Sequence, residues 1–288
     1  MMPARPIAGR ELGWSAELLR SSPLAVHYRP VMAPLSREAC DALAHGALPP
    51  ELLPTPEQVV HGSALSPLMV THGYALEPGG GMRVALRTPM PDVSPAMVDW
   101  WFGWHSCSPE RYKLWHPRAH VHAEWLRQPP PGSEGRARYV GHTSIVDEYV
   151  GGELGRFAVQ FMAPEALGFD AARLGEDVAT AVCARAGLTH LPIDAGYLVH
   201  EVLAVPGGSE MRSYFWLGGR YAAARGGGAL GALAISVARR VLRPTERDAR
   251  AMLTHCAEEM AHLATFLPTL YREQRDVSVG SGQAQARP

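Results

Sequence analysis

A long helix near the C-terminal end of the chain is the sequence feature that most constrains its fold. Residues 245 to about 268 combine helix-forming side chains with a stripe of apolar ones, and Thr245 is suited to cap the N-terminus. The stripe consists of Met252, Cys256, Leu263, Phe266 and Leu267. A helix with one apolar face has to pack that face against another layer, so the rest of the chain must supply a matching surface.

The segments ahead of this helix have the alternating pattern and the turn residues of antiparallel hairpins. The predicted pairs are residues 66–76 with 82–90, residues 137–151 with 155–164, and residues 195–205 with 210–221. Residues 94–105 predict a short buried helix that Ser94 caps. Residues 171–187 contain helix formers and end at a glycine, so they are predicted to form another helix.

Several hairpins followed by one long helix predict an α+β fold in which a curved antiparallel sheet wraps the helix. Such a fold leaves a cavity between sheet and helix, where a small apolar ligand can bind. Along the chain we expect a small N-terminal helical cap over residues 1–60, the main domain over residues 61–275 and a disordered tail over residues 276–288.

The composition excludes several classes of function. The chain has 288 residues, of which 47% are hydrophobic, and 27 basic residues balance 28 acidic ones, so it has a sizeable core and no net charge that attracts nucleic acid. The four cysteines are scattered, and neither a signal peptide nor an apolar run of about 18 residues is found. We therefore expect a cytoplasmic protein with reduced thiols and no membrane segment. The absence of GxSxG, P-loop and GxGxxG motifs argues against serine-hydrolase and nucleotide chemistry.

The long helix also carries a pair of residues with metal-ligand spacing. His255 and Glu259 lie four positions apart, hence on one helix face, where both can bind one ion. Glu258 and His262 have the same spacing, but they lie further toward solvent, whereas Glu259 falls within the apolar stripe. A carboxylate in that position is costly unless it is paired or metal-bound. Taken alone, the pair is explained slightly better by a helix salt bridge without an ion.

Two other segments offer partners for this pair. Glu148 shares a strand face with Val146 and Val150, so an acid points into apolar surroundings, whereas Asp147 points away. The segment RYKLWHPRAHVHAEW contains three histidines, each able to complete a site or to lie at a loop surface: His116, His120 and His122. Two histidines and two carboxylates suit Zn(II), with Mn(II) and Fe(II) as alternatives.

A further histidine, His200, alternates with Leu198 and Val202 in a predicted strand. A histidine with apolar strand neighbours is more often a satisfied core residue than a catalyst, so the pattern alone favours a core position.

Five segments, in this order, resemble the diacetylphloroglucinol and phloretin hydrolase family: TPMPDVSPAMVDWWFGWH, RYKLWHPRAH, VDEYVGGELGRFAVQF, HEVLAVPGGSEMRSYFWLGG and HCAEEMAHLATFLPTLY. Members of this family are zinc-dependent enzymes that hydrolyse the carbon-carbon bond between an aromatic ring and an acyl group. The resemblance spans roughly residues 68–272. It implies a Bet v 1-like helix-grip domain, a homodimer and a small aromatic acyl-phenol as substrate.

The family pattern implies four metal ligands, which fall on His120, Glu148, His255 and Glu259. His120 is preferred to His116 because of its spacing from Tyr112. By the same resemblance, Tyr112 and Tyr214 hydrogen-bond the phenolic hydroxyls, and His200 is the acid/base group. The resemblance therefore favours a catalytic role for His200 over the core position that the strand pattern alone favoured.

One departure from the family pattern leaves the substrate open. Some members place a substrate-contacting asparagine shortly after the metal-binding histidine, whereas this chain has Ala123. Together with the glycine-rich residues 225–231, Ala123 would also fit a remodelled pocket. The alternative function is therefore a helix-grip binding protein or a non-hydrolytic aromatic-polyketide enzyme such as a cyclase.

Overall fold

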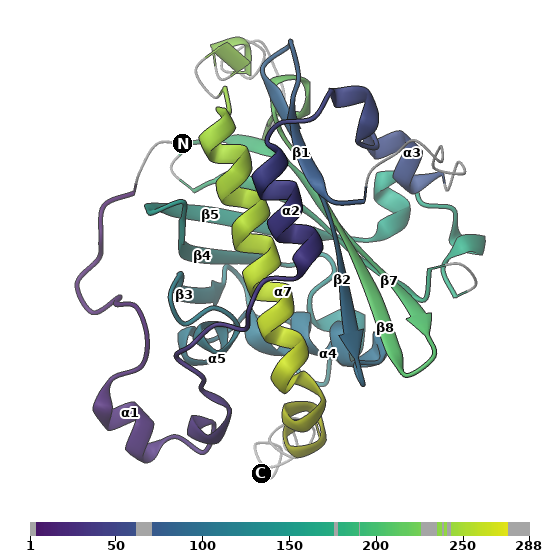
Figure 1. Cartoon of the computed structure of the whole chain (residues 1–288). Coiled ribbons are helices and arrows are strands. Elements are labelled where there is room, and N and C mark those ends of the chain that lie inside the picture. Colours follow the sequence, from purple (N-terminus) through teal and green to yellow (C-terminus); the bar gives the residue numbers. More distant parts are fainter. Residues whose placement is uncertain are drawn as a thin grey trace.

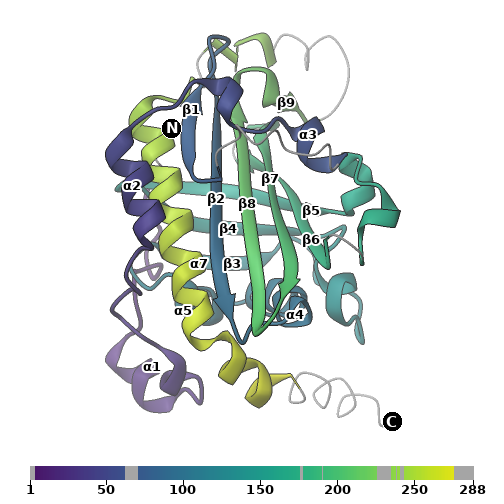
Figure 2. The ribbon, with the colours of Figure 1, turned by 45° about the vertical axis from the view of Figure 1, so that its right-hand side comes forward.

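The computed structural model describes residues 4–61, 71–175, 178–189, 191–225, 235–237, 239–240 and 243–275. Within these residues, a single antiparallel sheet of nine strands curves around the helix α7 (Glu246–Gln274), as Figures 1 and 2 show. In sheet order the strands are β1 (Gly73–Leu76), β2 (Gly81–Pro91), β8 (Gly208–Gly218), β7 (Ile193–Val205), β6 (Thr180–Leu188), β5 (Glu153–Met162), β4 (Thr143–Val150) and β3 (His120–Trp125), while β9 (Ala223–Ala224) pairs with β7. The predicted α+β helix-grip fold is confirmed.

The remaining elements are short helices. The α-helices are α1 (Ala16–Ser21), α2 (Arg37–His45), α3 (Pro56–Val60), α4 (Pro95–His105) and α5 (Pro109–Trp115). The 3-10 helices are η1 (Ala25–His27), η2 (Pro50–Leu52), η3 (Gly135–Arg138), η4 (Pro164–Leu167), η5 (Ala171–Arg173) and η6 (Gly219–Tyr221). The cap of α4 is Ser94, as predicted.

The three predicted hairpins are confirmed as β1–β2, β4–β5 and β7–β8, although residues 62–70 lie outside the described residues. The turn between β7 and β8 needs glycine for steric reasons. Gly207 has a φ of +81°, and a β-carbon on Gly208 would lie 2.4 Å from the carbonyl oxygen of Met90. The glycines of PGGS therefore allow the two longest neighbouring strands to meet in a tight turn.

The prediction of a helix over residues 171–187 is wrong, because residues 180–187 belong to β6 and Ala171–Arg173 form only the 3-10 helix η5. The strand pairs with β5 on one side and β7 on the other, so both edges of its backbone are hydrogen-bonded. Val182 faces the inner core and Cys183 the outer one, which buries both sides of the strand. Pairing and burial in the middle of a sheet outweigh the modest helix propensity of its alanines.

The long helix begins as predicted and ends later. Thr245 and Asp248 form a capping box, and the helix continues through Pro268 to Gln274. His262 was expected toward solvent, but it is 1% exposed. The backbone N–H of Ala33 donates to its Nδ1 at 3.2 Å, so the N-terminal segment covers this side of the helix.

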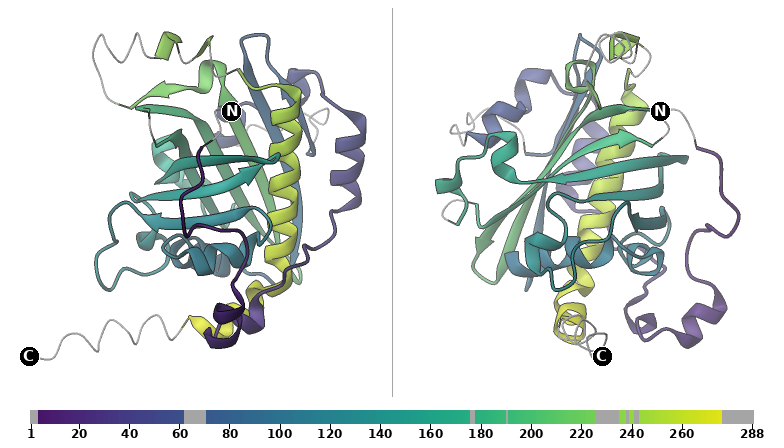
Figure 3. Two further views of the ribbon diagram at one scale, coloured as in Figure 1. Left: turned by 90° about the vertical axis from the view of Figure 1, so that its left-hand side faces the viewer. Right: turned by 180° about the vertical axis from the view of Figure 1, so that it is seen from behind.

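The N-terminal segment contains α1, α2 and α3, yet it has no core of its own. Trp14, Leu24 and Ala39 all belong to the core between the sheet and α7, the inner core. Helix α2 lies beside α7 and β1, and Figure 3 shows α7 between α2 and the strands β3 to β5. The domain boundary at residue 60 stays a prediction. The predicted disordered tail, residues 276–288, and all of the glycine-rich residues 225–231 except Arg225 lie outside the described residues.

The sheet has an apolar core on each face. The inner core fills the space between the sheet, α7 and α4, and Trp101, Leu263 and Phe266 are at most 1% exposed there. The outer core lies under the segment that contains η2 and α3, and it includes Leu53 and Trp216. Among the described residues, no helix is both long and apolar enough to cross a membrane.

Replacing Leu263 with alanine tests the inner core. Leu263 is fully buried on α7, so we expect Leu263→Ala to lower the free energy of unfolding by about 2–5 kcal/mol in urea titrations. The matched control is Leu126→Ala, because Leu126 is 64% exposed and its truncation should cost less than about 0.5 kcal/mol. Equal losses in the two variants would contradict this packing.

Candidate metal centre and cavity

Three elements bring four histidine and glutamate side chains together. His120 opens β3, and its cross-strand partner in β4 is Glu148. Helix α7 crosses the same region and presents His255 and Glu259 from one of its faces. All four side chains are less than one-fifth exposed.

The distances between the side-chain atoms fit a single small cation. His120 Nε2 lies 3.7 Å from Glu148 Oε2 and 3.5 Å from Glu259 Oε2. His255 Nε2 lies 3.9 Å from Glu148 Oε2 and 3.6 Å from Glu259 Oε2. Tetrahedral ligands at about 2.0–2.2 Å from Zn(II) stand roughly 3.4 Å apart, so shifts of a few tenths of an ångström would complete such a site. His120, Glu148 and His255 also each offer a ligand atom within 4.8 Å of the others.

The orientation of His120 is that of a metal ligand. Its Nδ1 donates to the carbonyl oxygen of Tyr112 at 3.0 Å, which leaves the lone pair on Nε2. That Nε2 atom is buried and has no hydrogen-bond partner among the residues that the structure describes. A buried polar atom without a partner is destabilising unless something binds it, and a cation between the two carboxylates would do so.

Burial controls the charges of the cluster. It raises the pKa of Glu148 to about 7 and, together with the charge of Glu148, raises the pKa of Glu259. It lowers the pKa of His255 to about 3 and lowers that of His120 as well. The histidines are therefore neutral, as metal ligands have to be, and a divalent cation would stabilise the ionised form of the two carboxyl groups.

Tyr112 supports the cluster from the side of α5. Its hydroxyl donates a short hydrogen bond to Glu148. Its ring stacks on that of His120 with centroids 3.7 Å apart and an interplanar angle of 5°. Tyr112 thus orients two of the four candidate ligands, and it also lines the adjoining cavity.

The other candidate ligands lie outside the cluster. Nε2 of His116 lies 3.1 Å from Glu258 Oε2, and the His116 ring stacks on His255 with centroids 5.0 Å apart. His122 lies near the half-exposed Glu124 instead. The spacing that favoured His120 over His116 therefore agrees with the geometry.

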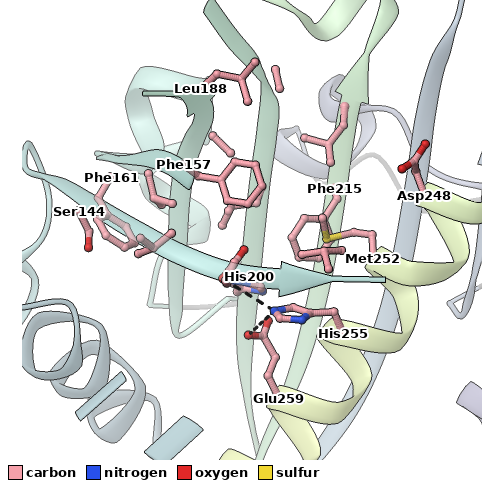
Figure 4. A pocket seen from close by; sticks show the side chains of 18 of the residues that line it. Ser144, Phe157, Phe161, Leu188, His200, Phe215, Asp248, Met252, His255 and Glu259 are labelled. Atoms are coloured by element: carbon pink, nitrogen blue, oxygen red, sulfur yellow. Dashed lines mark ion pairs between the residues drawn. The ribbon is translucent and has the colours of Figure 1, made fainter. Parts of the chain in front are cut away.

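A mostly apolar cavity of about 320 Å³ adjoins the cluster. It lies between the sheet and α7, with His255 and Glu259 at one end and Leu188 and Asp248 further away (Figure 4). His200, on β7, lines the same pocket from the side of the sheet (Figure 4). The cavity gives a small organic molecule access to the candidate metal centre.

His200 lines the cavity, and only its Nδ1 has a hydrogen-bond partner within the described part of the chain. Its Nδ1 lies 2.8 Å from the hydroxyl oxygen of Ser213, and its ring packs against Phe102 and Phe215. Burial lowers the pKa of His200 to about 3, so the imidazole is neutral near pH 7. Nε2 remains for contact with a ligand.

Tyr214 lies on the opposite face of the sheet, contrary to the expected contact with a phenol. It belongs to the outer core, where it stacks on Trp216, and it does not line the cavity. The cross-strand pair of His200 and Ser213 explains this placement, because Phe215, two residues after Ser213, shares its face. Matching the two strands in sequence would have revealed Phe215 in place of Tyr214.

Sequence reasoning also missed polar residues of the cavity. Ser144 shares the strand face of Glu148, so its alternation was a usable signal. His105 and Ser106 line the cavity from the end of α4, and the sequence analysis assigned neither of them a functional role. Ala123 is fully buried in the inner core and is not among the residues that line the cavity.

The strand order and the central α7 define a helix-grip protein with a candidate metal centre at the end of its cavity. A family model described as DAPG hydrolase PhiG domain matches residues 59–272. The chain therefore belongs to the DAPG hydrolase family.

Characterised relatives match over most of their length. A 2,4-diacetylphloroglucinol hydrolase of Pseudomonas protegens is 32% identical, with 88% of this chain and 85% of that protein covered. A phloretin hydrolase of Eubacterium ramulus is 26% identical, with 87% of this chain and 89% of that protein covered. Among solved structures, Ara h 8.0201 is similar at 13% identity and a TM-score of 0.34, covering 64% of this chain and 99% of that chain.

Metal analysis of purified variants tests the cluster. We expect a stoichiometric divalent ion in the wild-type protein and its loss in His255→Ala, because that substitution removes a ligand from α7. The matched control, His122→Ala, removes a histidine outside the cluster and should keep the ion. A chelator should lower the melting temperature of the wild-type protein and of His122→Ala, but not that of His255→Ala. Equal metal content in the two variants would contradict the assignment.

Proposed function

We propose that the chain is a metal-dependent hydrolase that cleaves the carbon-carbon bond between a polyhydroxylated aromatic ring and an acyl group. The observation that carries this proposal is the cluster of His120, Glu148, His255 and Glu259 at the end of an apolar cavity. Membership of the DAPG hydrolase family supports the class of reaction. The names of the relatives support acylphloroglucinols and phloretin-like compounds as substrates.

Zn(II) is the metal that we propose for this cluster. Two imidazoles and two carboxylates form the ligand set, and the unpartnered Nε2 of His120 is available for binding. Once bound, Zn(II) would polarise the acyl carbonyl or activate a water molecule. Four protein ligands fill a tetrahedral site, so a fifth position or a shift of one carboxylate would be required during catalysis.

The residues of the cavity bind the substrate and move its proton. Apolar side chains such as Phe157 and Phe215 would hold the ring and exclude bulk water. In the tautomer whose Nδ1 donates to Ser213, Nε2 of His200 carries the lone pair, so it would accept the hydrogen bond of a ring hydroxyl and relay its proton to the ring carbon that carries the acyl group. Water then adds to the acyl carbon and supplies the hydroxyl group of the acid product. The carbon-carbon bond breaks, its electron pair returns to the ring, the ring oxygen regains a proton from that water, and the ring carbon keeps the hydrogen it received.

The assembly and location of the protein are part of the proposal. The family resemblance favours a homodimer that acts on a small aromatic acyl-phenol, and we propose that the protein is cytoplasmic. Neither nucleic acid nor a membrane is expected as a partner, because the chain has a net charge of only -1.

A hydrolysis screen tests the reaction. Purified protein should release the ring and the free acid from an acylated di- or trihydroxybenzene, and a chelator should reduce turnover at least about 10-fold. Chromatography of both products measures the reaction. Bound metal without hydrolysis of any such compound would favour another helix-grip enzyme such as a cyclase, and absence of metal would favour a binding protein.

Replacing His200 tests its role in proton transfer. We expect His200→Ala to lower kcat by about 10²–10⁴-fold, because the proton loses its carrier, while the metal content stays unchanged. The control is Tyr214→Phe, which alters the outer core and should leave kcat nearly unchanged. If His200→Ala keeps nearly full turnover with metal bound, His200 is not the acid/base group.

A further inference from the structure

We propose that His105 is a substrate-positioning residue whose Nε2 accepts a hydrogen bond from a free hydroxyl on the substrate ring. The identity of this ring rests on the proposed function. His105 is the last residue of α4, it is 3% exposed, and it lines the cavity. Nothing in the family match or in the names of the relatives assigns it a role.

The hydrogen bonds of α4 determine the tautomer of His105. Its Nδ1 lies 2.7 Å from the carbonyl oxygen of Trp101, one turn earlier in the helix. A carbonyl oxygen can only accept, so Nδ1 carries the hydrogen and Nε2 carries the lone pair. Burial lowers the pKa of His105 to about 3, which keeps the imidazole neutral.

Nε2 lacks a donor among the residues that the structure describes around it. The nearest polar side-chain atom is the hydroxyl oxygen of Ser106, at 3.4 Å. The hydroxyl of Ser106 already donates to the carbonyl oxygen of Phe102 at 2.8 Å, and that of Ser144 donates to the carbonyl oxygen of Ser106 at 3.0 Å. Each hydroxyl has one hydrogen, so neither serine is left to serve Nε2. A hydroxyl of the ligand would supply the missing donor.

The His105 ring is held firmly in place. It stacks between Trp101, with centroids 4.7 Å apart, and Tyr112, with centroids 5.8 Å apart. Trp115 contacts the His105 ring edge-on from a third side, with centroids 4.9 Å apart. An acceptor that cannot turn away selects one position of the bound hydroxyl, and it loses little entropy on binding.

His105 also lies close to the reacting end of the cavity. Its neighbour Tyr112 donates to Glu148, so a single side chain separates His105 from a candidate metal ligand. A ring hydroxyl on His105 would place the ring near the cluster, where the acyl group has to lie for hydrolysis. A neutral acceptor favours a hydroxyl over a methyl ether, because only the hydroxyl can donate.

The test measures binding and needs no hydrolysis. Isothermal titration calorimetry would compare 1,3,5-trihydroxybenzene with 1,3,5-trimethoxybenzene on metal-loaded wild-type protein, His105→Phe and His105→Gln. His105→Phe keeps the stacked ring but removes the acceptor. We expect it to lower the affinity for the hydroxylated ligand about 10-fold or more and the affinity for the ether less than about 2-fold. His105→Gln keeps an acceptor near the position of Nε2 and should recover part of the loss. The control His142→Phe replaces a histidine outside the cavity and should change neither affinity.

Several outcomes would overturn the proposal. These are equal losses for both ligands, unchanged affinity in His105→Phe, and no binding of 1,3,5-trihydroxybenzene to the wild-type protein. If His105→Phe does not fold, ¹⁵N-histidine NMR of the wild-type protein decides, because the Nε2 resonance of His105 must shift with the hydroxylated ligand and not with the ether. A protein that hydrolyses nothing but shows this pattern would refute the proposed reaction and retain the role of His105.

Discussion

The contact between α7 and the concave face of the sheet positions every group of the candidate site. It brings His255 and Glu259 against His120 and Glu148, which lie on neighbouring strands far earlier in the chain. The same contact excludes water from the cluster, so the two carboxylates are costly to ionise and the histidines stay neutral. Packing of apolar side chains along α7 thus holds together a set of buried polar groups that a divalent cation would stabilise.

The sequence predicted the parts of this fold in which local pattern and tertiary position agree. The hairpin around PGGS and the capped start at Thr245 need particular residues at particular places, so they can be recognised without a structure. The segment of β6 could not be recognised as a strand, because its alanines favour a helix. It is a strand because β5 and β7 pair with it on both sides. His262 was misplaced for a similar reason, since a distant backbone segment covers it.

In the candidate site, too, some residues could be recognised from local sequence pattern and others could not. Alternation along β4 and the spacing along α7 indicated Glu148 and Glu259, because both lie on apolar faces. The resemblance added His120, and the geometry agrees with that choice. It also implied Tyr214, whose side chain lies on the other face of β8, since one step along a strand exchanges the two faces. His105 was missed because its importance depends on one unoccupied lone pair, which no residue pattern reveals.

Tyr112 touches both ends of the reaction site, since its hydroxyl binds Glu148 and its ring packs on His105. A residue shared in this way makes two binding events thermodynamically linked. If an ion in the cluster strengthens the hydrogen bond between Tyr112 and Glu148, it also restricts the motion of Tyr112 and His105, which line the binding site of the substrate ring. Linkage then requires that the ring strengthens the binding of the ion by the same factor as the ion strengthens that of the ring. A protein of this design would hold its metal most tightly while its substrate is bound.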